Sequence, residues 1–380
     1  MYDLFIPSAS GVESVVKREL ERLGYPNAKA DNGRIKLVGE QEDIARLNMC
    51  LRSGERVLIK LAEFNAQTFD QVYDNVYAFC WQDILPVDAR ILVYGKSINS
   101  KLFAIKSLTS IVKKAIINKL YDCYKCNLNE TGSRYKIEIA LLGDNAVITL
   151  DTTGEGLHKR GYRTLSHQAP MKETLANALI DFSIYNPDKT LVDLFCGSGT
   201  IPIEACLRAL NIAPGLYRDY DYRHWHTFDN KSYDLAKEEA QDKQTLDRRV
   251  DISGYDISSE AIDISRYHAK QAGVDKYINW QVAPMNKFTS DIRFGVLVSN
   301  LPYGQRVGEV EDIIQINKDL GKLYSRLPDW NFYLFTSDQN FERQFGKRAD
   351  KVRKLYNANI QCAYYSYPSK VKPIKIAKND

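Results

Sequence analysis

The sequence has no uninterrupted apolar run of about 18 residues, the length that a membrane-spanning helix needs. Residues 1–7 lack the basic segment and long apolar stretch of a secretory signal, so we expect no such signal. The seven cysteines are odd in number and scattered, which suits a reducing compartment better than a disulfide framework. These absences predict a cytoplasmic protein without a membrane partner.

Internal repeats and low-complexity tracts are absent too, and the apolar content of 44% is ordinary for a globular protein. A chain of 380 residues favours about two or three domains. The net charge of +4 is small, yet ten Lys or Arg residues and only three acids lie between Arg90 and Ala140. Such a cluster can attract a phosphate backbone, although a solvated helix face is the commoner reason for a run of lysines.

Two small α+β units are predicted in the first part of the chain. Ser10, with Glu13 three residues later, has the spacing of a capping box at the start of the first helix. The first unit has predicted strands at 2–6, 33–38 and 56–64 and helices at 10–23 and 42–51. The second has predicted strands at 91–97, 135–142 and 146–151 and a helix at 103–121. Residues 152–168 show no periodicity and are expected to connect domains.

From Ala169 onward, strand and helix patterns alternate, which predicts an open, mostly parallel α/β sheet. The turn Asn357-Ala358-Asn359 predicts an antiparallel hairpin at the edge of this sheet. The predicted strands lie at 190–193, 252–255, 278–282, 296–299, 331–336, 352–356 and 361–367.

The loop after the strand at 190–193 is the first of two informative motifs. Its glycines allow a ligand to approach the backbone where a side chain would clash. Pro202 stands where a dinucleotide fingerprint needs its third glycine, and the carboxylate of Asp193 suits an amino group better than a pyrophosphate. The loop therefore predicts a nucleoside-containing cofactor, with a ligand-free tight turn as the alternative. The candidate cofactor-binding residues are Asp193, Phe195, Cys196, Gly197, Ser198, Gly199 and Thr200.

The next strand ends in Gly254-Tyr255-Asp256-Ile257-Ser258. Ligands of open α/β sheets bind at the carboxyl ends of the strands, and an acid there can accept both ribose hydroxyls. Asp256 and Ile257 are therefore further candidates for cofactor binding. The alternative, a cap for the helix that begins at Ser259, is compatible with this role.

The second motif is Asn300-Leu301-Pro302-Tyr303, after the strand at 296–299. The side-chain carbonyl of Asn300 and the main-chain carbonyl of Leu301 can accept hydrogen bonds from an exocyclic amine and direct its lone pair toward an incoming methyl group. Pro302 stiffens the turn, and Tyr303 offers a stacking face. No general base is required, because the methylated amine becomes acidic and can release its proton to solvent. In isolation a plain Asn-x-Pro turn would be favoured, but the upstream glycine loop favours methyl transfer to a base nitrogen.

Other polar motifs carry less weight. Cys123 and Cys126 have the spacing of metal ligands but lack a second pair, so we expect no metal. Cys196 lies inside the glycine loop, which favours packing over a nucleophilic role. His224 and His226 belong to the aromatic stretch 217–228, for which a surface insertion shaping the substrate cleft is expected.

At these residues the chain resembles THUMP-domain class I S-adenosylmethionine-dependent RNA guanine-N2 methyltransferases of the YpsC type, which are related to the N-terminal half of RlmL. Further support comes from Gly161-Tyr162-Arg163, from Ala169-Pro170-Met171-Lys172-Glu173-Thr174-Leu175-Ala176 and from Pro302-Tyr303-Gly304. The resemblance implies a ferredoxin-like region over 1–64, a THUMP RNA-binding domain over 65–155 and, over 156–380, a Rossmann-like methyltransferase domain with a mostly parallel seven-stranded sheet. It also implies S-adenosylmethionine as cofactor, with Pro170, Thr174 and Asn300 among the residues that bind it.

The same resemblance implies an RNA partner, with 23S ribosomal RNA as the expected substrate, and RNA contacts from Lys101, Lys106, Lys113 and Lys114. Two departures matter. Leu301 replaces the first proline of an Asn-Pro-Pro-Tyr motif, which leaves N6-adenine methylation of RNA or DNA as an alternative. Pro284 stands where an acid near the cofactor's adenine is common, so backbone atoms of residues 283–285 would have to contact that base. A non-catalytic RNA-binding factor is a third hypothesis, against which the intact acids and Asn300 argue.

Overall fold

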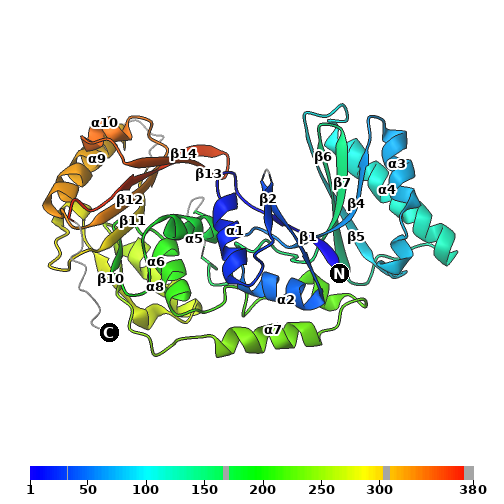
Figure 1. Ribbon diagram of the computed structural model, residues 1–380, viewed down its shortest axis with the longest axis horizontal. Helices are drawn as coiled ribbons and strands as arrows, with labels where there is room; N and C mark the ends of the chain where they lie inside the picture. The colour runs from blue at the N-terminus through cyan, green and yellow to red at the C-terminus, as the bar shows by residue number, and fades with distance from the viewer. Residues whose placement is uncertain (32, 166–170, 303–308, 372–380) are drawn as a thin grey trace.

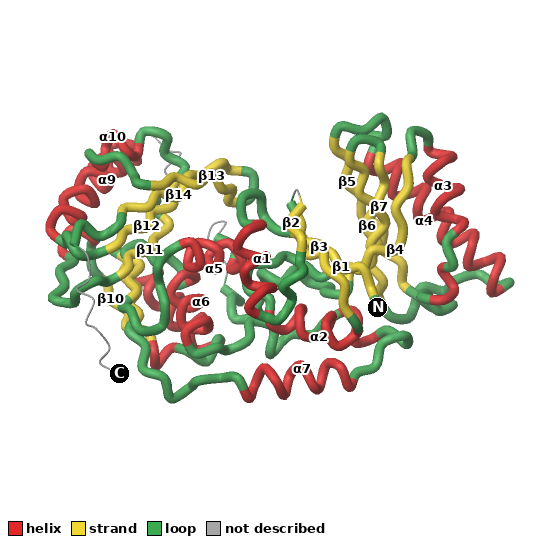
Figure 2. Tube along the Cα trace, viewed as in Figure 1, coloured by secondary structure: helices red, strands yellow, loops and turns green. Residues whose placement is uncertain are grey.

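The computed structural model describes residues 1–31, 33–165, 171–302 and 309–371, and its strands form two seven-stranded sheets (Figure 1). Figure 2 shows the C-terminal strands toward the left of the molecule and the N-terminal strands from its centre to the right, with several helices between the two groups. Within these ranges, no helix combines the length and the apolar character needed to cross a bilayer.

The N-terminal sheet has the strand order β2-β3-β1-β4-β7-β6-β5. Burial alternates along its strands: Leu4 and Ile6 point into the main core, whereas Phe5 points to the other face and contacts Leu58 and Val147. The helices pack on the first of these faces. The elements are β1 (Tyr2–Pro7), α1 (Glu13–Arg22), β2 (Lys29–Asp31), β3 (Arg34–Gly39), α2 (Gln41–Cys50), β4 (Leu58–Asn65), α3 (Phe69–Ala78), β5 (Arg90–Ile98), α4 (Ile105–Tyr124), β6 (Arg134–Leu142) and β7 (Asn145–Asp151).

Strand β4 joins the two predicted α+β units into one sheet. It pairs antiparallel with β1 through Leu58 and Ile59, and along its other edge with β7 from Leu58 to Asn65. The sequence predicted two units but not this shared sheet, because a strand's burial pattern does not show which neighbours its two edges will find. The two α+β units are consequently continuous through backbone hydrogen bonds.

The C-terminal sheet has the order β10-β9-β8-β11-β12-β14-β13. The strands from β10 to β12 are parallel, and β14 pairs antiparallel with both β12 and β13 at the edge. This confirms the predicted open α/β sheet with a terminal hairpin. Its elements are α5 (Glu173–Phe182), β8 (Leu191–Asp193), α6 (Thr200–Ala209), α7 (Lys231–Asp242), β9 (Ile252–Asp256), α8 (Ser259–Gln271), β10 (Ile278–Val282), β11 (Val296–Asn300), α9 (Glu309–Arg326), β12 (Asn331–Thr336), α10 (Phe341–Phe345), β13 (Lys351–Asn357) and β14 (Ile360–Tyr367).

The start of α1 differs from the prediction. A turn in which the Val12 N–H donates to the Ala9 carbonyl separates Ser10 from the helix, and Val12 takes the N-cap position without a side-chain cap. The carboxylate of Glu13 instead accepts a hydrogen bond from the backbone N–H of Gly33 at 3.3 Å. The predicted Ser10 cap is therefore wrong, because a turn at Gly11, with a φ of +86°, intervenes.

The stretch around α7 is also placed differently from the prediction. Tyr220, Tyr222 and Trp225 are buried, the Trp225 ring stacks on Tyr135 of β6, and α7 runs beside α2 (Figure 1). The Tyr220 hydroxyl donates to the carbonyl of Asn48 at 3.1 Å. This stretch packs the C-terminal region against the N-terminal sheet and is not a surface insertion, because its aromatic residues fill the junction.

A carboxylate at the same junction holds α1 against α5 and α6. The side chain of Asp181 is 1% exposed and pairs with Arg18 at 2.5 Å, Arg22 at 2.8 Å and Arg208 at 2.6 Å. Burial raises the pKa of Asp181, but these guanidinium groups outweigh burial and hold its pKa at about 2. The ionised Asp181 therefore neutralises cations contributed by both halves of the chain.

We expect Asp181→Ala to lower the free energy of unfolding by about 2–3 kcal/mol, because three guanidinium groups lose their shared partner. Since the folded-state pKa is depressed, this contribution is present at neutral pH and is lost as the pH falls below about 4 toward 2. Chemical denaturation at neutral pH measures it. Asp188→Ala, which removes an exposed partner of Arg248, is the matched control and should change stability little. Equal stabilities for the two variants would contradict this role.

Candidate active site

The carboxyl ends of β8, β9 and β11 meet at one edge of the C-terminal sheet. Asp193 is in register with Gly254, two residues before Asp256, and β8 pairs parallel with β11 through Val296 and Leu297. The Leu194 N–H donates to the Ser299 hydroxyl at 3.0 Å and ties the glycine loop to the end of β11. The fold thus brings Asp193, the glycine loop, Asp256 and Asn300 to one place.

The two glycines of the loop have different surroundings. Both have positive φ angles, +51° at Gly197 and +81° at Gly199. A Cβ at Gly199 would lie 2.9 Å from the ring of Trp280, so packing requires glycine there. A Cβ at Gly197 would meet no atom within 4 Å, which means that the backbone at Gly197 borders open space. The loop is therefore fixed on one side and open on the side where a ligand could lie.

Helix α8 and Asp256 hold this loop in place. The Gly197 N–H donates to Asp256 Oδ2 at 2.9 Å, and the Ser265 hydroxyl donates to the Gly197 carbonyl at 2.7 Å. His268 Nδ1 lies 3.1 Å from the carbonyl of Ser198. Sequence analysis missed Ser265 and His268. Their spacing of three residues places them on one face of α8, but only the fold shows that this face meets the loop.

Asp193 is a buried carboxyl group that lacks a cationic partner among the described residues. It is 1% exposed, and its Oδ1 accepts a hydrogen bond from the Phe195 N–H at 3.1 Å. Burial raises the pKa of Asp193 to about 7, although hydrogen bonds from Ser299 and Phe195 act in the opposite direction. A carboxyl group in this state is suited to receive a cationic group.

The raised pKa of Asp193 predicts a pH-dependent stability. Because the folded state holds this proton more tightly than the unfolded state, stability is lost as the pH rises through about 7. The Asp193→Asn variant should be the more stable protein at about pH 8, by at most about 4 kcal/mol, and should show little advantage near pH 4. Denaturation of the ligand-free proteins at both pH values measures the difference. A stability difference that does not vary with pH would contradict the raised pKa.

Asp256 and Ile257 lie at the end of β9. Asp256 Oδ1 accepts from the Ser258 N–H at 3.0 Å, and Ser258, whose hydroxyl accepts from the Ala261 N–H, is the N-cap of α8. Asp256 is therefore not the helix cap, and its carboxylate retains acceptor capacity for hydroxyl groups. Ile257 is 75% exposed, so an apolar surface lies beside this carboxylate. The Ala283 N–H donates to the Asp256 carbonyl at 2.9 Å, so this one backbone group of residues 283–285 is already engaged.

Asn300, at the end of β11, has a buried side-chain oxygen without a hydrogen-bond partner among the described residues. Such an atom normally costs free energy unless a ligand or water satisfies it. The Leu301 N–H donates to the Phe335 carbonyl at 2.9 Å, and the Leu301 side chain is buried, which fixes the turn on the sheet. Pro302 is exposed, and Tyr303 lies outside the described residues.

Two further cofactor candidates, Thr174 and Pro170, precede the glycine loop in the chain. The Thr174 hydroxyl is buried and donates to Glu55 Oε1 at 2.7 Å, and Lys172 pairs with the same carboxylate at 3.0 Å. Burial raises the pKa of Glu55, but hydrogen bonds from His158, Thr174 and Lys172 hold it at about 2. Thr174 therefore links the start of α5 to the N-terminal region. Pro170 lies outside the described residues.

The thiol of Cys196 is buried inside the loop, and burial raises its pKa well above its ordinary value. A thiol in this state is a poor nucleophile, which agrees with a packing role. Ser198 and Thr200 face each other across the turn, with their hydroxyl oxygens 3.5 Å apart, and Phe195 is half-buried at the edge of the second core.

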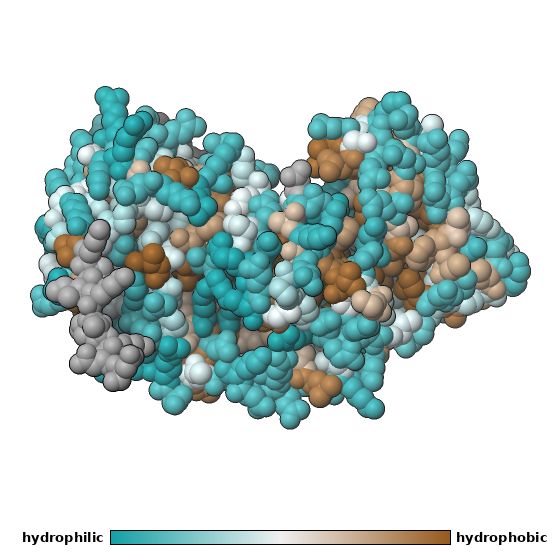
Figure 3. Space-filling model, in the orientation of Figure 1, coloured by the Kyte–Doolittle hydropathy of each residue, from teal (hydrophilic) through white to brown (hydrophobic). Residues whose placement is uncertain are grey.

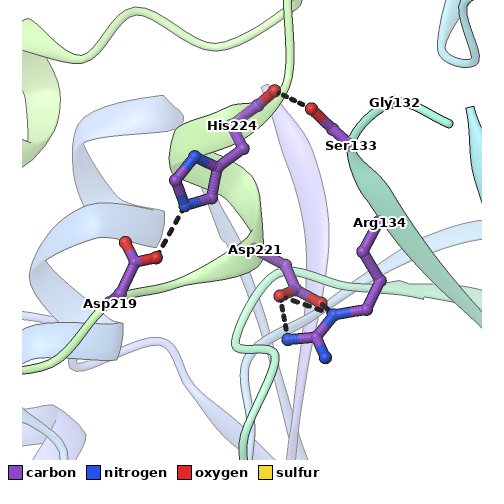
Figure 4. Close-up of a pocket in the computed structure, with 6 residues that line it drawn as sticks. All are labelled: Gly132, Ser133, Arg134, Asp219, Asp221 and His224. Carbon is purple, nitrogen blue, oxygen red and sulfur yellow. Dashed lines mark hydrogen bonds and ion pairs between the residues drawn. The ribbon is translucent and has the colours of Figure 1, made fainter.

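A separate pocket of about 480 Å³ lies between β6 and the stretch before α7 (Figure 4). Arg134 binds the carboxylate of Asp221 through two nitrogens, and His224 Nε2 lies 2.6 Å from Asp219. The Ser133 hydroxyl donates to the backbone carbonyl of His224, not to its ring, so these residues do not form a nucleophilic triad. Within the described ranges, no group of three or more His, Cys, Asp or Glu residues could hold a metal ion. The pocket therefore lies among the residues that pack the C-terminal region against the N-terminal sheet.

Three stretches of the chain match models of protein families. They are the RlmL ferredoxin-like domain over 3–58, the THUMP domain over 66–151 and the RMKL-like methyltransferase domain over 160–366. Over 98% of its length the chain is 41% identical to "Putative RNA methyltransferase YpsC" of Bacillus subtilis (strain 168), of which the match covers 97%.

Two further relatives extend the comparison. The chain is 31% identical, over 97% of its length, to the ribosomal RNA large subunit methyltransferase K/L of Psychromonas ingrahamii, but spans only 50% of that protein. The crystal structure of SMU.472 complexed with SAH has a TM-score of 0.92 and 37% identity, with 98% of this chain and 99% of that chain covered.

Proposed function

Because this chain belongs to the family that carries the RMKL-like methyltransferase domain, we propose that it methylates the exocyclic N2 of a guanine in 23S ribosomal RNA. It is an RNA methyltransferase that uses S-adenosylmethionine. In the proposed division of labour, residues 1–64 form the ferredoxin-like region, residues 65–155 bind RNA and residues 156–380 carry out catalysis in the cytoplasm.

The buried side-chain oxygen of Asn300, which has no hydrogen-bond partner among the described residues, carries this proposal. An acceptor at that point fits an N–H donor that arrives with the substrate, and the exocyclic amine of a base is such a donor. The end of β11 is adjacent to the glycine loop through the Leu194–Ser299 hydrogen bond. The acceptor therefore lies beside the proposed cofactor site.

The chain's own residues fit S-adenosylmethionine. The open space at Gly197 would admit the cofactor, the buried carboxylate of Asp193, which has no cationic partner within the described ranges, would hold its amino group, and Asp256 would accept its ribose hydroxyls. The exposed side chain of Ile257 offers an apolar surface for its adenine. When bound, the cofactor would supply an electrophilic methyl group, and the electron pair of the broken sulfur–carbon bond would stay on the departing sulfur.

The proposed mechanism relies on positioning. The Asn300 carbonyl oxygen and the Leu301 main-chain carbonyl accept the two hydrogens of the guanine amine and hold its lone pair in line for transfer. Tyr303 is proposed to stack on the base. After the new nitrogen–carbon bond forms, the cationic nitrogen releases a proton to water, so no basic side chain is needed. The N2 amine faces the minor groove of a helix, so the guanine must be unpaired or flipped out.

Methylation of adenine N6 is the second candidate, because Leu301 replaces a proline and the same two acceptors could hold the adenine amine. Both candidates share the site, so mutation of Asn300 does not separate them. The two candidates are separated by incubating the enzyme with labelled cofactor and RNA and then analysing the labelled nucleosides. Label in N2-methylguanosine supports the proposal, and label in N6-methyladenosine contradicts it.

RNA contacts are proposed for Lys101, just before α4, and for Lys106, Lys113 and Lys114 within α4; we call these four the α4 lysines. Lys113 pairs with Glu130 at 2.9 Å, and Lys101 Nζ donates to Gln67 at 2.6 Å, so phosphates would have to compete with these partners. Of the basic cluster, Arg134 and Lys136 are unavailable, because they bind Asp221 and the Gly154 carbonyl.

We expect simultaneous replacement of these four lysines by Ala to weaken RNA binding across sequences. Each lost phosphate contact should flatten the log–log salt dependence of affinity by about 0.7 to 0.9. Binding measured over a salt series tests this, and cofactor binding should not change. A variant with Ala at three lysines outside this segment, Lys17, Lys231 and Lys237, is the control. If both variants match the wild type in slope and affinity, the α4 lysines form an ordinary solvated face.

A further inference from the structure

Large apolar side chains are exposed at one end of the THUMP strands. Ile98 and Leu142 are each 53% exposed and Phe103 is 81% exposed, although all three follow or end well-packed elements. We call these three residues the THUMP tip. Figure 3 shows hydrophobic residues exposed at this end of the lobe, beside the hollow that separates it from the methyltransferase lobe. Contiguous exposed apolar residues on a soluble protein often mark an interaction site.

The sheet itself explains why the tip is exposed. In β6, Ile137, Ile139 and Leu141 are buried, so Leu142 at the end of the strand points to the opposite face. Ile98 is the register partner of Leu142 and shares that face. Helices α3 and α4 cover the other face of these strands (Figure 2). Tyr94, four residues before Ile98, lies on the same helix-free face and is 53% exposed.

Hydrogen bonds hold the tip in one conformation. The Gly143 N–H donates to the Ile98 carbonyl at 3.1 Å, joining the β6–β7 turn to the end of β5. Asp144 Oδ1 accepts from the Lys101 N–H at 2.7 Å, and the Asp144 N–H donates to the Ser100 hydroxyl at 3.0 Å. The apolar side chains therefore rest on a preformed platform, which lowers the entropy cost of binding a partner.

Lysines lie near the apolar tip. Lys101 and Lys106 are exposed and flank Phe103 in the sequence. Lys96, between Tyr94 and Ile98 on the strand, pairs with Glu138 at 2.9 Å, so Lys101 and Lys106 supply the positive charge. Asp144 accepts a hydrogen bond from the Lys101 N–H. An aromatic and apolar centre with a cationic border matches unpaired nucleobases joined by phosphates, since bases stack on apolar faces and phosphates pair with lysines.

We propose that the THUMP tip, with Tyr94 beside it, binds unpaired bases of the RNA substrate. This inference rests on the proposed RNA methyltransferase function and adds a second point of contact, outside the catalytic domain. Recognition here is by stacking on Phe103 and Tyr94, whereas the α4 lysines would contact phosphates without regard to base pairing.

The test compares Phe103→Ala with Tyr217→Ala, because Tyr217 is also 81% exposed but lies outside the tip. The probes are an RNA hairpin with an unpaired loop and a fully paired RNA duplex of the same length. We expect Phe103→Ala to weaken binding of the hairpin by about tenfold without changing the salt slope, since a lost stack releases no counterions. Tyr217→Ala should not weaken it, and Phe103→Trp should retain full affinity. Neither alanine variant should affect binding of the duplex.

Hairpin binding by Phe103→Ala at wild-type affinity would overturn the inference. So would an equal loss for hairpin and duplex, or a flattened salt slope, which would indicate a phosphate contact. Sedimentation tests whether a second copy of this chain covers the tip instead of RNA. A wild-type dimer that dissociates in the Phe103→Ala variant would also overturn the inference. Failure of the proposed function can be told apart from failure of this inference. If guanine is not methylated but the hairpin still binds through its loop, the catalytic assignment is refuted and the assignment of the tip stands.

Discussion

Asn300→Ala is expected to abolish methyl transfer while leaving the affinity for S-adenosylmethionine nearly unchanged. The side-chain oxygen of Asn300 is buried and unpartnered in the described structure, so its proposed partner is the substrate amine. Loss of one of two aligned acceptors should cost several kcal/mol in the transition state, a decrease in turnover of roughly 1,000-fold. Single-turnover assays with RNA, together with calorimetry for the cofactor, measure the two effects separately.

Asn279→Ala is the matched control for this variant. Asn279 is exposed on β10 and lies outside the proposed catalytic residues, so its loss should leave turnover unchanged. Turnover of the Asn300→Ala variant within about threefold of the wild type would rule out the positioning role. A large loss of cofactor affinity would instead assign Asn300 to cofactor binding.

Asp256→Ala is expected to have the opposite signature, with a strong loss of cofactor affinity. Its carboxylate accepts the Gly197 N–H at 2.9 Å and is proposed to accept ribose hydroxyls, so the variant loses both the ligand contacts and a support of the loop. Charge-assisted hydrogen bonds contribute about 1.5–3 kcal/mol each, which predicts a dissociation constant raised by roughly 100-fold or more. Calorimetry with S-adenosylmethionine measures it.

The control for Asp256→Ala is Asp263→Ala, which removes an exposed carboxylate from α8. Cofactor affinity should be retained in that variant. Asp256→Asn should give an intermediate loss, because an amide keeps one acceptor oxygen but cannot accept from both neighbouring N–H groups. A dissociation constant for Asp256→Ala equal to that of the wild type would show that the ribose is bound elsewhere.

The α/β half of the fold could be predicted from the sequence because its signals are local. Strands β8, β11 and β12 are short, mostly apolar and buried runs between turns, and Gly197 and Gly199 mark a strand-to-helix turn by their residue type alone. The hairpin around Asn357 was predictable for the same reason. The resemblance to a family implied a mostly parallel seven-stranded sheet, whereas the strand order was not predicted and comes from the structure.

Contacts between distant segments could not be predicted. The pairing of β4 with both β1 and β7, the stacking of Trp225 on Tyr135 and the contact of Thr174 with Glu55 each join residues far apart in the chain. No local periodicity encodes such partners. The same limit explains why Ser265 and His268 escaped notice, and why Arg134 and Lys136 were counted with a basic surface although they bind partners at the domain junction.

The most direct test of guanine N2 methylation is nucleoside mass spectrometry of 23S ribosomal RNA from cells that lack this protein. The account predicts that one N2-methylguanosine disappears, that the wild-type protein restores it and that the Asn300→Ala variant does not. Loss of N6-methyladenosine instead, or an unchanged set of methylated nucleosides in 23S RNA, would contradict it.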